Sequence, residues 1–226
     1  LWNVKTGKCL NVFAGHAGPI TCGGFTSDGK LLVTGSEDAS VRIWNPVTAE
    51  CIHVFQHETM FLDGPITAFA SQKQEPNLIL TGCEDGSVDL SHIGNKKVIG
   101  ILKEHKDSIE SVAFSSFASS VPVAPMMATA GMDKLINLWD VSTLTKRQTM
   151  AHEDGVIKVL FDDNQPLVYS CSVDRTVSVW DVRTGKPVQV FRGHRNLVLD
   201  FVKSSDSTHI FTAADDGKSL VFALNK

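Results

Sequence analysis

Short apolar runs recur along the whole chain, and clusters of turn-forming residues separate them. Residues 16–56 show the pattern: PITCGGF is followed by the turn TSDGK, and the runs LLVTGS, SVRIWN and CIHVFQ come after it. These runs are rich in aliphatic and β-branched residues and alternate with a period of two in places. No segment keeps a 3.6-residue period. The pattern therefore predicts four short antiparallel strands in this stretch and very little helix anywhere.

One pattern returns five times: an aliphatic run, a Ser or Thr, a small residue, an Asp and, six residues later in most copies, an aromatic residue. The aspartates are Asp38, Asp85, Asp133, Asp174 and Asp216, at intervals of 47, 48, 41 and 42 residues. A period of just over 40 residues that holds four short strands is typical of a β-propeller blade. We expect an all-β chain forming one propeller domain over 1–226, with blades at about 15–56, 57–103, 104–150, 151–192 and 193–226.

Each repeat also carries polar residues at fixed offsets, which we expect to form a hydrogen-bonded clasp. A buried Trp needs an acceptor for its indole N–H, and the Ser or Thr four residues before the Asp can supply it. A His in the preceding loop can then link that hydroxyl to the Asp. The complete sets are His16, Thr34, Asp38 and Trp44; His105, Thr129, Asp133 and Trp139; and His152, Ser170, Asp174 and Trp180.

Two repeats depart from the full set. The second has His57, Thr81 and Asp85, but Ser91 stands where the Trp is expected. The fifth has His194, Thr212 and Asp216, with Phe222 in place of the Trp. A phenyl ring has no N–H, so the hydrogen-bond chain of the fifth repeat must be shorter.

The Gly-His near the start of a repeat and the Trp-Asp or Trp-Asn near its end resemble the WD-repeat β-propeller family across essentially the whole chain. The family usually has seven or eight blades, which implies that the five blades here are part of a larger propeller. The alternative is a closed ring of five blades in which residues 8–13 complete the last sheet. Residues 1–14 are accordingly the end of a preceding blade or a closing strand.

Several strings, among them VYSCSVDRTVSVWDVRTG at 168–185 and ITCGGFTSDGK at 20–30, are similar to the angio-associated migratory cell protein group. The similar strings correspond to the C-terminal part of the proteins in that group. The resemblance implies one of two roles. Fungal members are chaperones of a newly made, basic ribosomal protein of the large subunit, and animal members are associated with cell migration.

Composition narrows the function classes. The formal net charge of −4 and the pI near 6.1 argue against binding nucleic acid over the whole surface, and no apolar run is long enough for a membrane span. The five cysteines are odd in number and show no CxxC spacing, so we expect small apolar side chains packed within strands rather than disulfides or a zinc site. The absence of a disulfide framework predicts that the protein resides in a reducing compartment. We expect the cytoplasm, and the nucleus as a further location.

The recurring His, Asp and Ser residues do not predict a hydrolase. A catalytic triad should occur once, whereas these groups return in each repeat at fixed offsets. The strings HETMF at 57–61 and HEDGV at 152–156 lack the second His of a zinc protease motif. We therefore expect no enzymatic activity, no catalytic residue, no cofactor and no metal.

A propeller leaves binding to its loops, and the residue before each clasp Asp should face solvent at the edge that carries the loop His. These residues are Glu37, Glu84, Met132, Val173 and Asp215, and the same edge should carry Glu58, Asp63, Asp107, Glu153 and Asp154. The acidic residues form either a solvated edge or a docking surface for a basic protein segment. The group resemblance implies a ribosomal protein as that partner.

Two insertions interrupt the repeat. Five extra residues follow His57, and they bring Met60, Phe61 and Leu62 into a loop next to Asp63. These apolar side chains either fold back into a groove between blades or anchor a partner, which is the basis of an alternative function as a signalling or cell-migration scaffold. The second insertion, at 114–125, is expected to be a plain flexible loop at the opposite edge.

Overall fold

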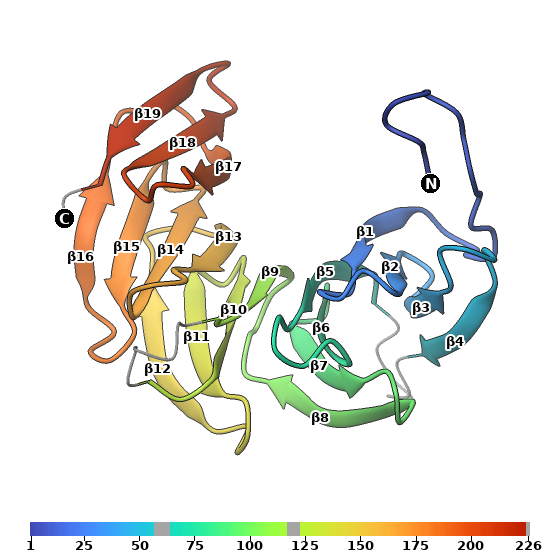
Figure 1. Cartoon of the computed structure of the whole chain (residues 1–226). Helices are drawn as coiled ribbons and strands as arrows, with labels where there is room; N and C mark the ends of the chain where they lie inside the picture. Colours follow the sequence, from blue (N-terminus) through green and yellow to red (C-terminus); the bar gives the residue numbers. More distant parts are fainter. Residues whose placement is uncertain (57–63, 117–122, 225–226) are drawn as a thin grey trace. The chain divides into compact units, whose positions relative to one another are not determined.

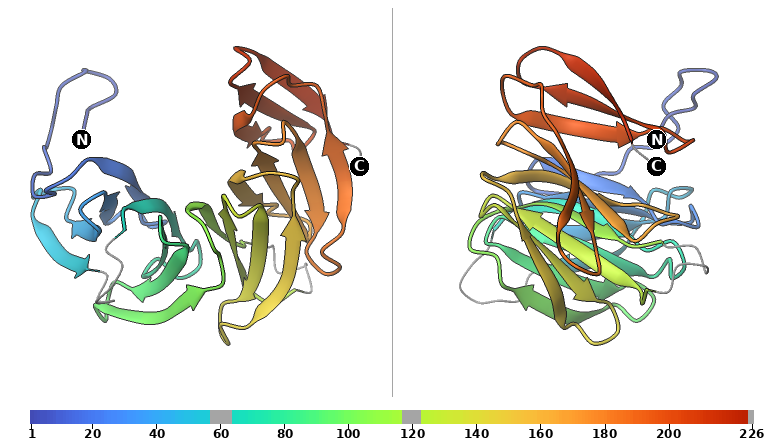
Figure 2. Two further views of the ribbon diagram at one scale, coloured as in Figure 1. Left: turned by 180° about the vertical axis from the view of Figure 1, so that it is seen from behind. Right: turned by 90° about the vertical axis from the view of Figure 1, so that its left-hand side faces the viewer.

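The computed structural model describes residues 1–56, 64–116 and 123–224, and every regular element in this part of the chain is a β-strand (Figure 1). The strands form five antiparallel sheets, four with four strands and one with three. The twist of the individual sheets can be followed from two further directions in Figure 2. The all-β class predicted from the strand pattern is confirmed, and the sheets are consistent with part of a β-propeller.

The chain divides into two compact units, Leu1–Glu104 and His105–Lys226. The first unit holds two sheets, each with its strands in sequence order. The strands of the first sheet are β1 (Ile20–Phe25), β2 (Leu32–Ser36), β3 (Ser40–Trp44) and β4 (Cys51–Gln56). Those of the second are β5 (Ile66–Ser71), β6 (Leu78–Cys83), β7 (Ser87–His92) and β8 (Lys97–Lys103).

The second unit holds three sheets, and each again pairs strands that follow one another in the chain. The third sheet comprises β9 (Ile109–Phe114), β10 (Met126–Gly131), β11 (Leu135–Asp140) and β12 (Lys146–Ala151). The fourth comprises β13 (Val156–Phe161), β14 (Leu167–Ser172), β15 (Val177–Asp181) and β16 (Pro187–Phe191). The fifth comprises β17 (Val198–Lys203), β18 (His209–Ala214) and β19 (Ser219–Ala223).

The predicted strands of the first repeat are found within one residue of their expected ends, because Gly, Asp and Pro residues end the runs locally. The tight turn between the second and third strands has a left-handed residue at the same position in all five sheets. The residue after each clasp Asp has a positive φ, in the left-handed region. These residues are Ala39, Gly86, Lys134, Arg175 and Gly217.

Consecutive sheets within a unit pack face to face, and their buried side chains form the core. In the first unit Val33 and Ile43 of the first sheet share a cluster with Ile66 and Ile79 of the second. In the second unit one cluster joins the third sheet to the fourth, and another joins the fourth to the fifth. The fourth sheet, which lies between the other two, therefore buries both faces, and β14 and β15 are buried along nearly their whole length.

Two expectations about the chain's details need correction. Residues 8–13 are the part of the chain that would form a closing strand, but here they take part only in a short hairpin, in which backbone hydrogen bonds from Asn3 to Lys8 and from Leu10 to Leu1 flank the single bridge between Trp2 and Cys9. A lone two-stranded hairpin is only marginally stable, so extended pairing does not develop there. Cys83 and Cys171 are buried in strands as expected, whereas the thiols of Cys9 and Cys51 are exposed.

Two further observations bear on organisation. None of the described residues belongs to a helix of the length and apolar character that crossing a membrane requires. The assignment of 1–226 to a single propeller domain stays a prediction.

Candidate functional site

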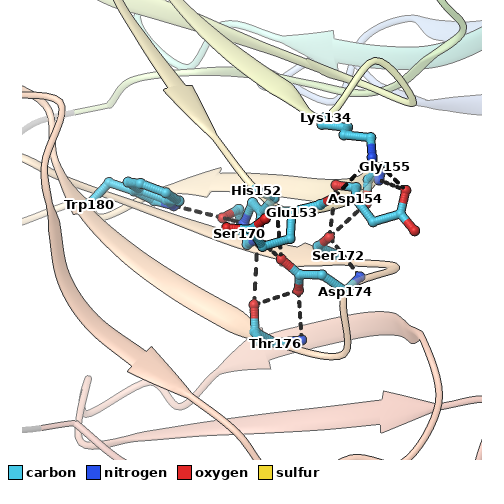
Figure 3. A network of polar contacts seen from close by, with 10 residues as sticks. All are labelled: Lys134, His152, Glu153, Asp154, Gly155, Ser170, Ser172, Asp174, Thr176 and Trp180. Atoms are coloured by element: carbon cyan, nitrogen blue, oxygen red, sulfur yellow. Dashed lines mark hydrogen bonds and ion pairs between the residues drawn. The ribbon is translucent and has the colours of Figure 1, made fainter.

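The clasp of the fourth sheet joins four parts of that sheet through side-chain hydrogen bonds (Figure 3). The indole Nε1 of Trp180 on β15 donates to Ser170 Oγ on β14 at 2.8 Å. Ser170 Oγ lies 2.7 Å from Nε2 of His152, whose Nδ1 lies 2.8 Å from Asp174 Oδ2. All four groups are satisfied when the serine hydroxyl donates to Nε2 and the Nδ1–H donates to the carboxylate. The chain runs from the interior of the sheet to its exposed turn.

The same chain is present in the first and third sheets. In the first sheet the distances from Trp44 to Thr34 and from Thr34 to His16 are 2.8 and 2.7 Å, and His16 Nδ1 lies 2.9 Å from Asp38. The third sheet has the equivalent contacts at 3.0, 2.8 and 2.9 Å. They join Trp139 to Thr129, Thr129 to His105, and His105 to Asp133.

The fifth sheet has the shorter version expected from Phe222. Thr212 Oγ1 lies 2.7 Å from His194 Nε2 and donates to the carbonyl of Leu220 at 3.2 Å. His194 Nδ1 is 3.2 Å from Asp216 Oδ2, farther than in the complete clasps. The phenyl ring of Phe222 packs on Phe191 instead, with 5.0 Å between the ring centroids. This clasp therefore lacks an indole donor, and the hydroxyl of Thr212 donates to a backbone carbonyl.

The second sheet has a small cavity beside its exceptional residue. Ser91 is buried, and with Thr81 and Asp89 it lines a cavity of about 10 Å³, the size of a single water. Asp85 accepts hydrogen bonds from the backbone N–H and the hydroxyl of Ser87 at 2.9 and 2.5 Å. His57, the loop histidine predicted for this clasp, lies outside the described residues.

Sequence reasoning missed a further hydroxyl in the clasp, two residues after the Asp. Ser40 Oγ donates to Asp38 Oδ1 at 2.6 Å, and Thr176 Oγ1 donates to Asp174 Oδ1 at the same distance. The signal was visible in the sequence as D-A-S, D-G-S and D-R-T in the first, second and fourth repeats. The hydroxyl occupies the second carboxylate oxygen, so the Asp bonds to both the loop and the turn.

Backbone N–H groups also donate hydrogen bonds to the clasp carboxylates. The N–H of the residue after the loop His donates to the same Asp oxygen in four sheets. The donors are Ala17, Lys106, Glu153 and Arg195, at distances of 2.8, 3.1, 3.2 and 2.8 Å. Each clasp thereby holds the His loop and the Asp turn together at one edge of its sheet. We call this edge the clasp edge.

These donors change the acidity of the clasp carboxylates. Burial acts to raise the pKa of Asp38, but hydrogen bonds from Ser40, Ala17 and His16 outweigh it and hold that pKa well below its usual range. The same balance of burial against donors, here His152 and Thr176, lowers the pKa of Asp174. For Asp216 the backbone N–H of Arg195 is the main cause of a lowered pKa. These aspartates are therefore ionised in neutral solution.

The clasp edge of the first unit presents two glutamates at equivalent positions. Glu37 and Glu84 are both exposed, and both backbone N–H groups donate to the carbonyl of a loop proline at 2.9 Å. The acceptors are Pro19 and Pro65. The equal hydrogen bonds show that the two carboxylates leave their sheets from the same backbone geometry. Lys103, at the end of β8, is the exposed cation beside them in the described part of this edge.

The clasp edge of the second unit carries both signs of charge. The predicted acidic residues Asp107, Glu153, Asp154 and Asp215 are exposed there. Exposed cations lie among them at the positions after the loop His or near the turn Asp, namely Lys106, Lys134, Arg175, Arg195 and Lys218. Sequence reasoning missed these cations, although the repeat offsets place them. Exposed cations are therefore more numerous on the clasp edge of the second unit than on the described part of that edge in the first unit, where Lys103 is the exposed cation.

Individual contacts in the second unit show this mixing of charge. Lys134 Nζ donates to the carbonyl of Glu153 at 3.0 Å and lies 3.7 Å from Asp154 Oδ1 (Figure 3). Asp215 accepts a hydrogen bond from Asn196 at 2.8 Å. Met132 is 37% exposed, whereas Val173 is half-buried.

The remaining predicted partner-binding residues are Glu58, Met60, Phe61, Leu62 and Asp63. They lie outside the described residues, as does most of the insertion at 114–125.

Comparison with known proteins agrees with the repeat geometry. The family model of the WD domain, G-beta repeat, matches residues 7–45, 96–140, 144–181 and 185–222. No matched segment covers β5, β6 or β7 of the second sheet, and β7 is the strand that has Ser91 in place of the Trp.

Curated relatives match the chain over its whole length. The angio-associated migratory cell protein of dog is 33% identical over 241 residues, covering 100% of this chain and 53% of that protein. The human protein of the same name is also 33% identical, with 54% of its length covered. An uncharacterized WD repeat-containing protein of Schizosaccharomyces pombe is 28% identical, over 97% of this chain and 56% of the relative. The chain thus spans about half the length of these relatives.

The matched segments cover most of the chain, and the clasps lie where the repeats place them. The chain belongs to the WD-repeat family of the WD domain, G-beta repeat type.

Proposed function

We propose that this chain is a non-enzymatic scaffold whose clasp edge in the first unit binds a basic segment of a partner protein. WD repeats support the general role of a protein-interaction scaffold. The single observation that carries the finer proposal is the equivalent placement of Glu37 and Glu84. Both carboxylates are exposed, and both stand on turns that a clasp Asp and a loop proline hold in place.

Fixed turns favour binding for a physical reason. A partner that docks on a mobile loop must order that loop, and the ordering costs free energy. The backbone of Glu37 is already fixed by the hydrogen bond to Pro19 and by the clasp of the neighbouring Asp38. Complementary charge then speeds encounter and selects a basic partner over an acidic one.

The difference between the units narrows the surface. In the second unit Lys134, Arg175 and Arg195 lie among the acidic residues and reduce the negative potential there. Glu153, Asp154 and Asp215 are therefore assigned a lesser part in binding than Glu37 and Glu84. We expect the basic residues of the partner to contact mainly the clasp edge of the first unit.

The identity of the basic partner rests on the likeness to the angio-associated migratory cell protein group, of which this chain spans about half. We propose a ribosomal protein, held before its assembly into the large subunit, in the cytoplasm or the nucleus. The name of the mammalian relatives instead refers to cell migration. A scaffold in that process, docking partners through residues 58–63, is the competing function.

The test compares three variants of the chain for binding to purified basic ribosomal proteins at two salt concentrations. The acidic-edge variant is Glu37→Lys with Glu84→Lys, the loop variant is Phe61→Ala with Leu62→Ala, and the matched control is Glu50→Lys. Glu50 is an exposed glutamate of the first sheet in the turn between β3 and β4, away from the clasp edge.

We expect the acidic-edge variant to bind at least tenfold more weakly than the unchanged chain. Binding by the unchanged chain should weaken as the salt concentration rises. The control and the loop variant should bind as the unchanged chain does. Loss in the loop variant alone favours the competing scaffold function. Affinity indifferent to both glutamates contradicts the proposed surface.

A further inference from the structure

A groove of about 510 Å³ opens on the second unit at the edge opposite its clasps. The clasp residue Asp133 precedes β11, and Asp140 ends that strand, so Asp140 lies at the opposite edge. The equivalent residue of the fourth sheet is Asp181 at the end of β15. The groove lies between the turns that follow these two strands, and the function proposed above does not use it.

The floor of the groove is apolar. Met126 and Val182 line it and are otherwise buried in the core cluster between the third and fourth sheets. Val123, half-buried, adds a third aliphatic side chain. A volume of this size falls in the range of sites that bind ligands of several hundred daltons.

Two arginines form the walls. Arg147 Nη2 donates to Asp140 Oδ2 at 2.6 Å, and Arg183 donates to both oxygens of Asp181, at 3.2 and 2.5 Å. These bonds orient the guanidinium groups, but the two side chains remain 54% and 63% exposed. An arginine has five N–H donors, so each of them keeps donors available for a ligand.

The paired carboxylates are much less exposed than the guanidinium groups, so the arginines form most of the surface that a ligand meets. Asp140 Oδ1 accepts hydrogen bonds from the N–H and hydroxyl of Ser142 and from the N–H of Thr143, and its side chain is only 5% exposed. The turn that follows β15 adds a further exposed cation, Lys186. The groove therefore presents cations at its walls and aliphatic groups at its floor.

A contact between the two sheets sets the spacing of the walls. Gln148 on β12 donates from Nε2 to the backbone carbonyl of Arg183 at 3.0 Å. Gly185 in the same turn has a positive φ, and a Cβ there would come within 3.0 Å of Gln148 Oε1. The two turns are thus held together before any ligand arrives, which reduces the ordering cost of binding.

We propose that this groove binds a short segment of a partner protein in which acidic side chains flank an aliphatic one. The carboxylates pair with Arg147 and Arg183, and the aliphatic side chain packs on Met126 and Val182. Nucleic acid fits less well, because its backbone offers phosphate charge but no aliphatic group for the floor. The proposed site is independent of the acidic clasp edge of the first unit and opposite to it in charge preference.

The test selects peptides from a phage-displayed library of random heptapeptides on the unchanged chain. Counter-selection uses the double variant Arg147→Gln with Arg183→Gln. Enriched peptides are then synthesised with a fluorescent label, and their affinities are measured by anisotropy. The matched control is Arg192→Gln, which removes an exposed arginine from the same unit but outside the groove. Circular dichroism melting of each variant confirms that it is folded.

We expect the enriched peptides to combine Asp or Glu with Leu, Ile or Val. They should bind the double variant at least tenfold more weakly and the Arg192→Gln variant as the unchanged chain. Enrichment without acidic residues, or affinity unaffected by the double variant, overturns the proposal. A labelled oligothymidylate that binds through Arg147 and Arg183 more tightly than the enriched peptides also overturns it in favour of nucleic acid.

If the double variant fails to fold, the single variants Arg147→Gln and Arg183→Gln replace it, since loss of either guanidinium group should weaken the same peptides. Binding to a basic ribosomal protein is measured on the same variants. Retained ribosomal-protein binding by the groove variants distinguishes failure of this site from failure of the acidic edge.

Discussion

The indole N–H of Trp180 donates a 2.8 Å hydrogen bond to the hydroxyl of Ser170, while the ring itself packs in the cluster shared with the third sheet. One side chain therefore joins two structural roles. It ends the clasp that reaches to Asp174, and it fills the interface between consecutive sheets. The loop and turn at the clasp edge are positioned by the same residue that stabilises the core.

Replacement of Asp174 by Ala should lower the free energy of unfolding by about 1–3 kcal/mol, because the buried His152 and the turn donors lose their acceptor. Asp216→Ala should cost less. Its clasp has longer contacts to His194 and no hydroxyl two residues further on. Urea unfolding followed by fluorescence measures both variants. Equal losses would contradict the ranking of the two clasps.

Substitution of Ala39 by Gly should stabilise the chain by up to about 1 kcal/mol. Ala39 has a φ of 60°, which a side chain disfavours, and the equivalent residues of the second and fifth sheets are Gly86 and Gly217. The gain is smaller than the strain relieved, since Gly also adds freedom to the unfolded chain. Thermal melting compares this variant with Ala17→Gly as the control. A lower melting temperature for Ala39→Gly would refute the strain argument.

Stability should fall in acid from about pH 5 downward. The pKa values of Asp38, Asp174 and Asp216 are lowered in the folded chain, so folding favours their ionised forms. Their contribution is complete above the unfolded pKa of about 3.9 and is lost as pH drops through the folded pKa. Melting temperatures at pH 7, 5 and 3.5 test this. Asp174→Asn should show a smaller acid-induced decrease, and an unchanged decrease would count against Asp174 as a source.

Two of the five thiols should react rapidly with a disulfide reagent in the native chain. Cys9 and Cys51 are exposed, whereas burial, with a smaller effect from Asp200, raises the pKa of Cys171 to about 12. Burial also raises the pKa of Cys22. Colorimetric titration should count two rapidly reacting thiols in the native chain and five in the chain unfolded by guanidinium. The Cys9→Ser and Cys51→Ser double variant should have none that react fast, and a remaining fast thiol would show that a core opens.

Much of the fold could be read from the sequence because its signals are local. The strand pattern, the turns and the clasp offsets all act within about 30 residues of one repeat, and they predicted the partners of Trp44, Trp139 and Trp180. The hydroxyls of Ser40 and Thr176 were within reach of the same reasoning, since they keep a constant offset from the Asp. The sequence could not show that residues 8–13 would form no strand, because strand formation there depends on which neighbouring strands are available for pairing.

The sequence by itself determined the repeats, the strands and the hydrogen-bonded clasps, because each is specified by residue types at short, constant spacings. Only the tertiary structure decided which side chains of different repeats meet and where an apolar floor remains open. Lys134 lies beside Asp154, and Gln148 holds Arg183, because consecutive sheets pack face to face. That packing depends on contacts between residues from different repeats, which a periodic pattern does not specify.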